Sequence, residues 1–477
     1  MRCYKLELTL TEPFACGARP LNGNEIGTLD YIPGANVRGS LAAALQYIEQ
    51  KPDLEKWFGY AGAARPVFRY SPAWPCDPVT GRRAAPMPLS FLYDKGDDGL
   101  QGDYGVWNHL LNGKDDAPIA EDAEGANTGH AFQWTRPRHR WLALDDRGLP
   151  VRGFSVPVEN TMHVGLHYSR RSSREGALYS QSSLPRGTKF EACVHGTESL
   201  PANRPELLFL GKRRSSGNGE ATLRFVERDS DPWWQTAALP AKGDICLQLM
   251  SDSIVPDVAT GGYLTGLGAG FWKSFCNAEL RSAHSASLSV QGWSGAWGLP
   301  RQASVAVAAG SVFRLGIGPD TDVVKLRRLT TGGLGLRTQE GFGWVVIDPP
   351  WLLQGRGSRL RGEKAPELDN VSPLPLSWPG VALERSAQVR LAKLARDLSP
   401  RLERHAPKIA ELAMRVSRSG VAHGVSYLTA MASRPNPHKW EEFDGVLRGV
   451  NVPAMEREEM SFLLDALAGL VRNRNRR

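Results

Sequence analysis

The sequence is poor in cysteine and has no long apolar run. Its six cysteines among 477 residues are scattered and form no Cys-x-x-Cys pair, which argues against a disulfide scaffold. A zinc site would have to combine Cys76 with His109, His130 and His139 over long loops, so we expect no bound metal. Nowhere do about 18 uncharged apolar residues stand together, and residues 1–10 lack the apolar core of a secretory signal. We therefore expect a cytoplasmic protein without a membrane span.

The fingerprints of common enzyme classes are also missing. No glycine run ends in the Gly-Lys-Ser/Thr of a mononucleotide-binding loop, and none has the spacing G-x-G-x-x-G with an acidic residue about 20 positions later. We find neither a catalytic pair of carboxylates nor a nucleophile elbow. A carbohydrate or nucleotide enzyme is therefore the weakest hypothesis, and we expect no cofactor.

Glycine, proline and positive charge are in excess. The chain has 50 Gly and 33 Pro, whereas average usage would give about 57 together, so we expect many turns and long loops. The formal net charge of +8 favours a polyanionic partner. It is unevenly distributed: Arg385–Arg477 has 17 basic and 10 acidic residues, and Arg136–Arg228 has 16 and 9. We expect the polyanion to contact Arg136–Arg228, and the basic tail to steer assembly or contact a neighbouring protein.

The N-terminal third predicts a strand, a helix and an insertion. Alternating apolar residues over Tyr4–Leu10 predict a half-buried strand, and helical spacing begins at Val37, with a cap at Asn36 or Gly34. Residues 71–150 have no sustained period. We interpret them as a long, partly ordered insertion whose one clear element is a short helix near Val106–Leu111.

The same order of elements then occurs twice. First come a strand at Lys189–Val194, a short helix at Arg204–Leu210, a glycine-rich loop and a strand at Ala221–Val226. The second copy has strands at Ile245–Leu249 and around Val312–Leu315, a helix at Val323–Leu329, another glycine-rich loop and a strand at Trp344–Ile347. We predict an α+β protein with two tandem βαββαβ modules of the split βαβ type, at residues 1–235 and 240–350. A linker at 351–380 and a helical unit at 381–477 complete the predicted domains.

Three glycine-rich loops carry basic side chains. They span residues 33–39, 211–219 and 332–343, and their basic residues are Arg38, Lys212, Arg213, Arg214 and Arg337. Glycine allows consecutive amides to point at one anion, and a loop that opens a helix adds the helix dipole. Any single loop is more simply a tight turn. Three in parallel positions favour a polyanion that passes several loops.

A second cluster combines histidines, an aromatic ring and arginines. It comprises His163, His167, Tyr168, Arg170, Arg171 and Arg174. Such side chains bind a sugar–phosphate chain and stack on bases. The alternatives are packing at a strand end, or metal-independent RNA cleavage with one histidine as base and another as acid. Trp293 and Trp297 could likewise stack bases or pack in the core.

Asp30 is a third candidate. It precedes Tyr31-Ile32-Pro33-Gly34, where a carboxylate could position a 2′-hydroxyl or a metal ion. An aspartate at such a place is more often a turn residue. We therefore treat Asp30, like His163 and His167, as a weak catalytic candidate.

Four motifs together resemble the RAMP superfamily of CRISPR effector subunits. They are Tyr31–Leu41, His167–Phe190, Gly292–Phe313 and Gly333–Val345, and they cover roughly residues 1–350 in the order of the type III-D double-module subunit. The resemblance implies two ferredoxin-like, RNA-recognition-motif-like modules. It also implies a subunit that caps one end of the antiviral ribonucleoprotein filament and holds the repeat-derived 5′ tag of CRISPR RNA. Our leading hypothesis is that this subunit is non-catalytic. Expected partners are the large polymerase-like subunit and the backbone RAMP subunits, and target RNA could also be contacted.

The resemblance and the loop chemistry together select thirteen RNA-binding candidates. They are Gly34, Asn36, Arg38, His167, Arg170, Arg171, Arg174, Lys212, Arg213, Arg214, Arg337, Gly341 and Phe342. Asp30 lies closer to the Ile-Pro-Gly signature than the cleaving aspartate of some relatives, so that role is not transferred. The tail after about residue 380 matches no motif of the family, and a fused helical element like a small subunit is one interpretation.

Overall fold

The computed structural model describes most of residues 2–354. The described residues are 2–20, 25–48, 57–58, 68–95, 105–112, 134–137, 139–166, 173–200, 204–211, 218–228, 239–240, 242–294, 299–354 and the isolated positions 394, 409, 412, 463 and 464. Apart from these isolated positions, the predicted C-terminal helical unit lies outside this part, as does nearly all of the predicted linker. Within it the protein is α+β, rich in strands and with few helices. No helix of the described part is long and apolar enough to cross a membrane.

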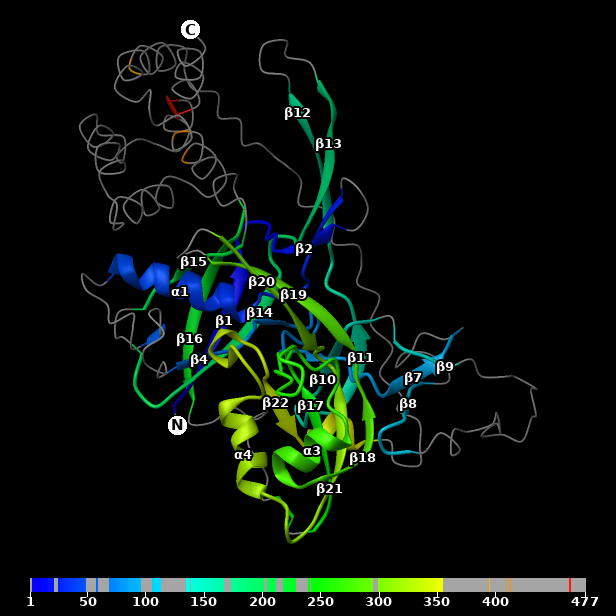
Figure 1. Ribbon diagram of the computed structural model, residues 1–477. Coiled ribbons are helices and arrows are strands. Elements are labelled where there is room, and N and C mark those ends of the chain that lie inside the picture. Colours follow the sequence, from blue (N-terminus) through cyan, green and yellow to red (C-terminus); the bar gives the residue numbers. More distant parts are fainter. Residues whose placement is uncertain are drawn as a thin grey trace.

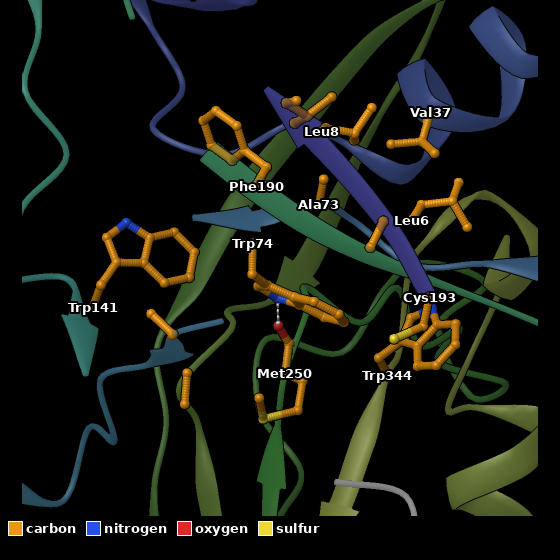
Figure 2. Packing of buried hydrophobic residues seen from close by; sticks show 14 of the residues in the cluster. Leu6, Leu8, Val37, Ala73, Trp74, Trp141, Phe190, Cys193, Met250 and Trp344 are labelled. Carbon is orange, nitrogen blue, oxygen red and sulfur yellow. Dashed lines mark hydrogen bonds between the residues drawn. The ribbon is translucent and has the colours of Figure 1, made fainter. Parts of the chain in front are cut away.

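The first sheet is built around β1 (Arg2–Leu10). Its strands lie in the order β15-β16-β1-β14-β4, all antiparallel, with β14 at Lys189–Gly196, β16 at Glu220–Arg228 and β4 at Phe68–Tyr70. The short strand β5 (Trp74–Pro75) also pairs with β14. Helix α1 (Gly34–Ile48) covers one face, where Val37 packs near Leu6 and Leu8 (Figures 1 and 2).

The helix predicted at Arg204–Leu210 is wrong. Strand β15 (Leu207–Phe209) lies there instead and pairs with β16. Leu208 is buried whereas Leu207 and Phe209 are half-buried, which is the alternation of an edge strand. Three residues are too few for sequence periodicity to separate a strand from a helical turn.

The second sheet has the order β18-β21-β17-β22, again all antiparallel. Its strands are β17 (Gly243–Leu249), β18 (Glu279–His284), β21 (Val312–Ile317) and β22 (Val345–Ile347). Helices α3 (Ala269–Cys276) and α4 (Val323–Gly332) follow β17 and β21. Asp322 caps α4 because its carboxylate accepts the Lys325 N–H at 3.0 Å, and Trp272 of α3 packs on Phe313 in a separate core.

Matching backbone hydrogen bonds lie at the ends of the two central strands. In the first unit, Leu10 donates to Thr188 and accepts from Gly187, while Phe14 and Leu184 bond each other in both directions. In the second, Leu249 donates to Ser311 and accepts from Gly310, while Ser253 and Val307 bond each other in both directions. In both units, the chain therefore makes the same backbone hydrogen bonds where it leaves the central strand.

The described part of the insertion holds short strands. The helix predicted near Val106–Leu111 is wrong, because a strand at Trp107–Asn108 and a turn lie there. The short strands form two three-stranded sheets, with the orders β11-β10-β6 and β8-β7-β9. Their strands are β6 (Ala85–Pro86), β7 (Phe91–Asp94), β8 (Trp107–Asn108), β9 (Trp134–Thr135), β10 (Trp141–Leu144) and β11 (Pro150–Phe154). These strands have two to five residues and several are buried throughout, so they leave no alternating pattern in the sequence.

Two hairpins complete the architecture. Strands β12 (Glu159–Leu166) and β13 (Ser173–Ser183) form a long hairpin that extends from the body in Figure 1 and joins β3 (Glu25–Thr28) and β2 (Gly17–Pro20) in one sheet. The second hairpin pairs β19 (Ser287–Ser294) with β20 (Leu299–Val307). Short helices η4 (Thr338–Glu340) and α5 (Pro350–Leu353) flank β22.

The main core runs across the predicted boundary between the modules. Trp74 donates through Nε1 to the Met250 carbonyl at 2.9 Å and meets Trp344 edge to face, with ring centroids 6.2 Å apart (Figure 2). On the sheet face away from α3 and α4, Gln248 donates to the Pro86 carbonyl of the insertion, and Trp351 of α5 donates to Gln248. The insertion therefore packs over the face of the second sheet.

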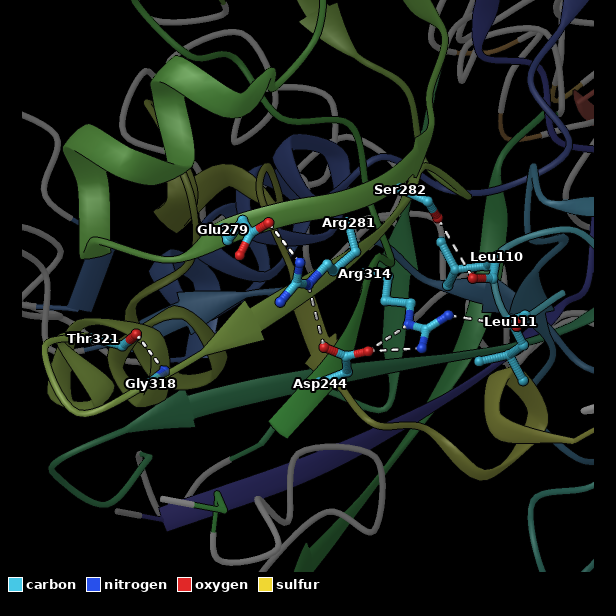
Figure 3. A network of polar contacts seen from close by, with 9 residues as sticks. All are labelled: Leu110, Leu111, Asp244, Glu279, Arg281, Ser282, Arg314, Gly318 and Thr321. Atoms are coloured by element: carbon cyan, nitrogen blue, oxygen red, sulfur yellow. Dashed lines mark hydrogen bonds and ion pairs between the residues drawn. The ribbon is translucent and has the colours of Figure 1, made fainter. Parts of the chain in front are cut away.

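A polar network lies on the same side of the second sheet. Asp244 of β17 pairs with Arg314 of β21 and Arg281 of β18, and Arg314 also donates to the Leu111 carbonyl (Figure 3). Ser282 of β18 donates to the neighbouring Leu110 carbonyl. The insertion is thus bonded to the edge of this sheet as well as packed on its face.

Arg69 links the first sheet to the glycine-rich loop of the second unit. It lies on β4 and donates to three carbonyls, of Thr331, Thr338 and Gly343, at 3.1–3.3 Å. Its guanidinium also lies over the Trp344 ring, 4.0 Å from the centroid. Burial lowers the pKa of Arg69 to about 9, so the side chain remains protonated at neutral pH.

Replacing Arg69 by methionine should lower the free energy of unfolding by about 3 kcal/mol, because three carbonyls lose their donor at once. Chemical denaturation of the purified chain measures the effect. Arg82→Met is the control: its side chain is 49% exposed and pairs with Asp146, so a change within about 0.5 kcal/mol is expected. Equal losses for the two variants would contradict a linking role for Arg69.

Candidate nucleic-acid interface

The second and third predicted glycine-rich loops are closed by the same kind of backbone hydrogen bond, which we call the loop neck. Leu210 donates to the Gly219 carbonyl at 2.6 Å, and Leu334 donates to the Gly343 carbonyl at 2.9 Å. Each neck is also bonded to the segment after its central strand: Gly219 donates to Pro13, and Gly343 donates to Asp252. The closing glycines have φ values of +83° and +64°, a conformation that favours glycine. Two loops of equal length thus leave equivalent places in the two units.

Arg213 and Arg337 occupy the same position in their loops when residues are counted from each neck. Arg213 stands two positions after Gly211, as Arg337 does after Gly335. Lys212, Arg213 and Arg214 lie outside the described residues, so their RNA-binding role stays a prediction. The correspondence nevertheless gives both loops an arginine at the same position.

Two of the predicted RNA-binding glycines contact each other. A Cβ on Gly34, the first residue of α1, would lie 2.6 Å from both the Glu340 carbonyl oxygen and Gly341 Cα. A Cβ on Gly341 would lie 2.7 Å from Gly34 Cα, and Gly341 has a φ of +97°. The close approach that these glycines permit is therefore between backbones of the two units. The first and third glycine-rich loops meet there.

Arg337 projects from this junction in a constrained conformation. Its φ of 56° is left-handed, and its guanidinium bonds Glu340 at 2.7 and 3.0 Å while lying 4.7 Å from the centroid of Phe342. Burial by itself would raise the pKa of Glu340, but Arg337 and Arg301 outweigh it and hold that pKa below its usual range. Glu340 is therefore ionised and fixes the Arg337 side chain.

Arg38 and Asn36 lie on α1, but their contacts are internal. The Arg38 side chain is buried and donates to the Phe58 carbonyl. Asn36 donates to the Cys16 sulfur at 3.1 Å. The helical pattern that begins at Val37 gave no sign that Arg38 would point inward. Arg38 is therefore buried, whereas the Arg337 side chain is 23% exposed.

The β12–β13 hairpin carries the described part of the histidine cluster. The His163 and Tyr179 rings stack on opposite strands with centroids 5.1 Å apart. Met162, Val164 and Leu178 are exposed on the other face of the hairpin. His167, Arg170 and Arg171 lie outside the described residues, and Arg174 is placed only as part of β13. Trp293 is likewise placed only within β19, and Trp297 lies outside the description.

Asp30 is used to join the insertion to the first unit. Its carboxylate accepts from Trp141 Nε1 at 2.8 Å and pairs with Arg140 at 2.9 Å. The neighbouring Tyr31 contacts the Trp141 ring edge to face and bonds Asp252 of the second unit. Burial, followed by the charge of Asp252, raises the pKa of Tyr31 well above its usual value. Within the described ranges, no three His, Cys, Asp or Glu side chains gather to hold a metal ion.

Comparison with known proteins gives only low similarities. No model of a protein family matches the sequence, and no curated protein matches it. Among solved structures, the chain is similar to a type III-B Cmr-beta complex bound to cognate target RNA, with 12% identity and a TM-score of 0.36, over 65% of this chain and 86% of that chain. It is also similar to oligomeric Cmr4 from Pyrococcus furiosus, with 11% identity and a TM-score of 0.22, over 48% and 100% of the two chains. TM-scores of this size do not establish a shared fold.

The Gly34–Gly341 contact gives a matched pair of variants on one helix. Gly34→Ala should lower the free energy of unfolding by about 2 kcal/mol, because the new methyl group meets backbone that cannot move aside. Gly39→Ala is the control: nothing lies within 4 Å of its added Cβ, and alanine should stabilise the helix by about 0.8 kcal/mol. Denaturant titrations of both variants measure the difference. An unfolding free energy unchanged by Gly34→Ala would contradict the close packing of Gly34 on Gly341.

Proposed function

We propose that this chain is an RNA-binding scaffold subunit of the RAMP kind with two ferredoxin-like modules. The strand orders β16-β1-β14-β4 and β22-β17-β21-β18 support it, because each has the arrangement that a split βαβ unit produces. In the first unit, β15 stands where the second helix of such a module would be. The motif resemblance at Tyr31–Leu41 and Gly333–Val345 supports the same assignment.

The observation that carries the proposal is the repeated loop neck with an arginine at the same position in both copies. A polyanion with regularly spaced phosphates suits two equivalent basic loops better than a small ligand does. The open face of a sheet, which RNA-recognition motifs use for stacking, is covered by the insertion in the second unit. RNA would therefore run along the loops and hairpins.

The finer assignment follows from the motif resemblance and the charge distribution. We infer a subunit of a type III CRISPR effector complex, of the III-D double-module kind, that holds the 5′ repeat-derived tag of CRISPR RNA. Its protein partners would be the large polymerase-like subunit and the backbone RAMP subunits. Within Arg136–Arg228, the histidine and arginine cluster at residues 163–174 would lie on the RNA path.

The rival function is a metal-independent ribonuclease acting on precursor or target RNA. Two contacts favour the non-catalytic scaffold: Asp30 is bonded to Arg140 and Trp141, and His163 is stacked on Tyr179. Incubating the protein with repeat RNA in the presence of a chelator decides between them. RNA cutting that disappears in His163→Ala or His167→Ala would favour the enzyme.

Binding of single-stranded RNA carrying the repeat-derived tag should weaken with salt. Replacing Lys212, Arg213 and Arg214 together by glutamine should make the slope of log K against log salt shallower by about 2, because each lost phosphate contact removes about 0.7. The matched control replaces three exposed arginines that already pair with carboxylates, namely Arg2, Arg224 and Arg281. Fluorescence anisotropy at several salt concentrations gives both slopes. Slopes equal to that of the unmodified chain in both triple variants would refute RNA binding at this loop.

A further inference from the structure

Two arginines from different elements of the second unit share one buried carboxylate. Arg301 of β20 donates through Nη1 to both Glu340 oxygens at 2.9 Å. Arg337 donates through Nε and Nη2 to Glu340 Oε2 at 3.0 and 2.7 Å. The side chains of Arg301 and Arg337 are 30% and 23% exposed, whereas that of Glu340 is 8% exposed. The buried carboxylate of Glu340 thus pairs with two guanidinium groups whose side chains are partly exposed.

The local charge and the remaining donors suit an anionic ligand. The ionised carboxylate cancels one of the two positive charges, so the group keeps a net charge of +1. Within the part of the chain that the structure describes, Nε and Nη2 of Arg301 and Nη1 of Arg337 donate to no acceptor. These are the N–H groups that bind phosphate oxygens in fork geometry.

The side chains of both arginines are partly exposed, and the neighbouring position 292 has no side chain. Gly292 of β19 is paired with Arg301, and a Cβ there would lie 3.6 Å from Arg301 Cδ and 4.0 Å from Arg337 Nη2. The absence of a side chain at position 292 therefore leaves space beside both arginines. The left-handed backbone of Arg337 is uncommon for a residue with a side chain and is retained where the surroundings hold it. Glu340 and Phe342 hold it here.

We propose that Arg301 and Arg337 bind one phosphodiester of the RNA backbone between them, and that Glu340 positions both guanidinium groups. The proposal rests on the proposed RNA-binding function and adds to it a residue, Arg301, and a subsite. Both arginines donate to the same oxygen, Glu340 Oε2, which brings the two guanidinium groups together. The shared subsite takes one phosphate because the two cations meet at this one carboxylate. The contact is to the backbone, so it does not depend on base identity.

The number of phosphates is tested by the salt slope of RNA binding in a double-mutant cycle. Arg301→Gln and Arg337→Gln should each make the log–log slope shallower by about 0.7, the value for one phosphate of a single strand. The double variant should reduce the log–log slope by no more than either single variant does, because the two arginines contact one phosphate. A double variant that loses about 1.4 would mean two separate phosphates, and unchanged slopes would mean no contact; either result overturns the shared subsite. Arg224→Gln, which removes an exposed arginine paired with Glu7, is the single-charge control and should leave the slope unchanged.

Glu340→Gln separates positioning from charge. Removal of a negative charge beside a polyanion would, by charge alone, strengthen RNA binding. If Glu340 positions the two arginines, the variant should instead bind RNA about 5-fold more weakly, because the charge-assisted bonds that hold the guanidinium groups are lost. Stronger binding by Glu340→Gln would refute the positioning role. Thermal unfolding of each variant verifies that it is folded, and Arg301→Lys, which keeps the charge, is the fallback if Arg301→Gln does not fold.

A separate measurement distinguishes failure of the subsite from failure of the RNA function. If the unmodified chain binds RNA at no salt concentration, the proposed function is wrong. The anion site is then judged by inorganic phosphate, which should raise the unfolding temperature of the unmodified chain but not of the Arg301→Gln/Arg337→Gln double variant. If phosphate affects both proteins equally, the anion site is also refuted.

Discussion

The packing of Gly34 against Gly341 constrains the arrangement of the candidate interface more than any other contact. At this point the first turn of α1 and the loop after α4 approach so closely that neither position has room for a β-carbon. Arg69 reinforces the contact by bonding three carbonyls around the same loop, which places a protonated guanidinium in a buried site supplied with acceptors. Since η4 lies within this loop, the positions of Arg337 and Glu340 follow from contacts made by the first unit. The interface therefore belongs to both units together.

The covering of the second sheet has a similar consequence. Gln248, Arg314 and Ser282 are the polar groups on or beside the face that an open sheet would offer to bases, and each is bonded to the insertion or to α5. Removing these contacts to admit RNA would leave the buried side chain of Gln248 without partners. Strand ends, loops and hairpins remain available. The repeated loop neck gives two of these sites the same geometry, which fits a ligand that itself repeats.

The sequence was informative where a pattern was long or chemically distinctive. The alternation of Tyr4–Leu10 and the helical spacing of Val323–Leu329 correspond to β1 and α4. The strands of the insertion could not be predicted, because two to five buried residues have no period, and β15 was assigned to the wrong class for the same reason. At Gly34 the pattern indicated a close approach but not its partner, which is a backbone 307 positions later at Gly341. The bond between Arg301 and Glu340 joins a hairpin to a short helix, and only tertiary structure brings them together.

Net charge indicates an RNA path only after the arginines that form ion pairs within the protein are set aside. Within Arg136–Arg228, Arg152 bonds Asp77 in the interior, Arg140 pairs with Asp30, Arg224 pairs with Glu7, and Arg204 lies over the rings of Tyr4 and Phe225. An arginine that already neutralises a carboxylate adds little to counterion release, because its charge is balanced before RNA arrives. Much of the basic excess of that segment therefore serves folding. Charges that can act on a polyanion are those in excess of their internal partners, as at Arg301 and Arg337, where two partly exposed cations share one carboxylate. An excess of arginine over its internal partners marks the interface better than the total charge does.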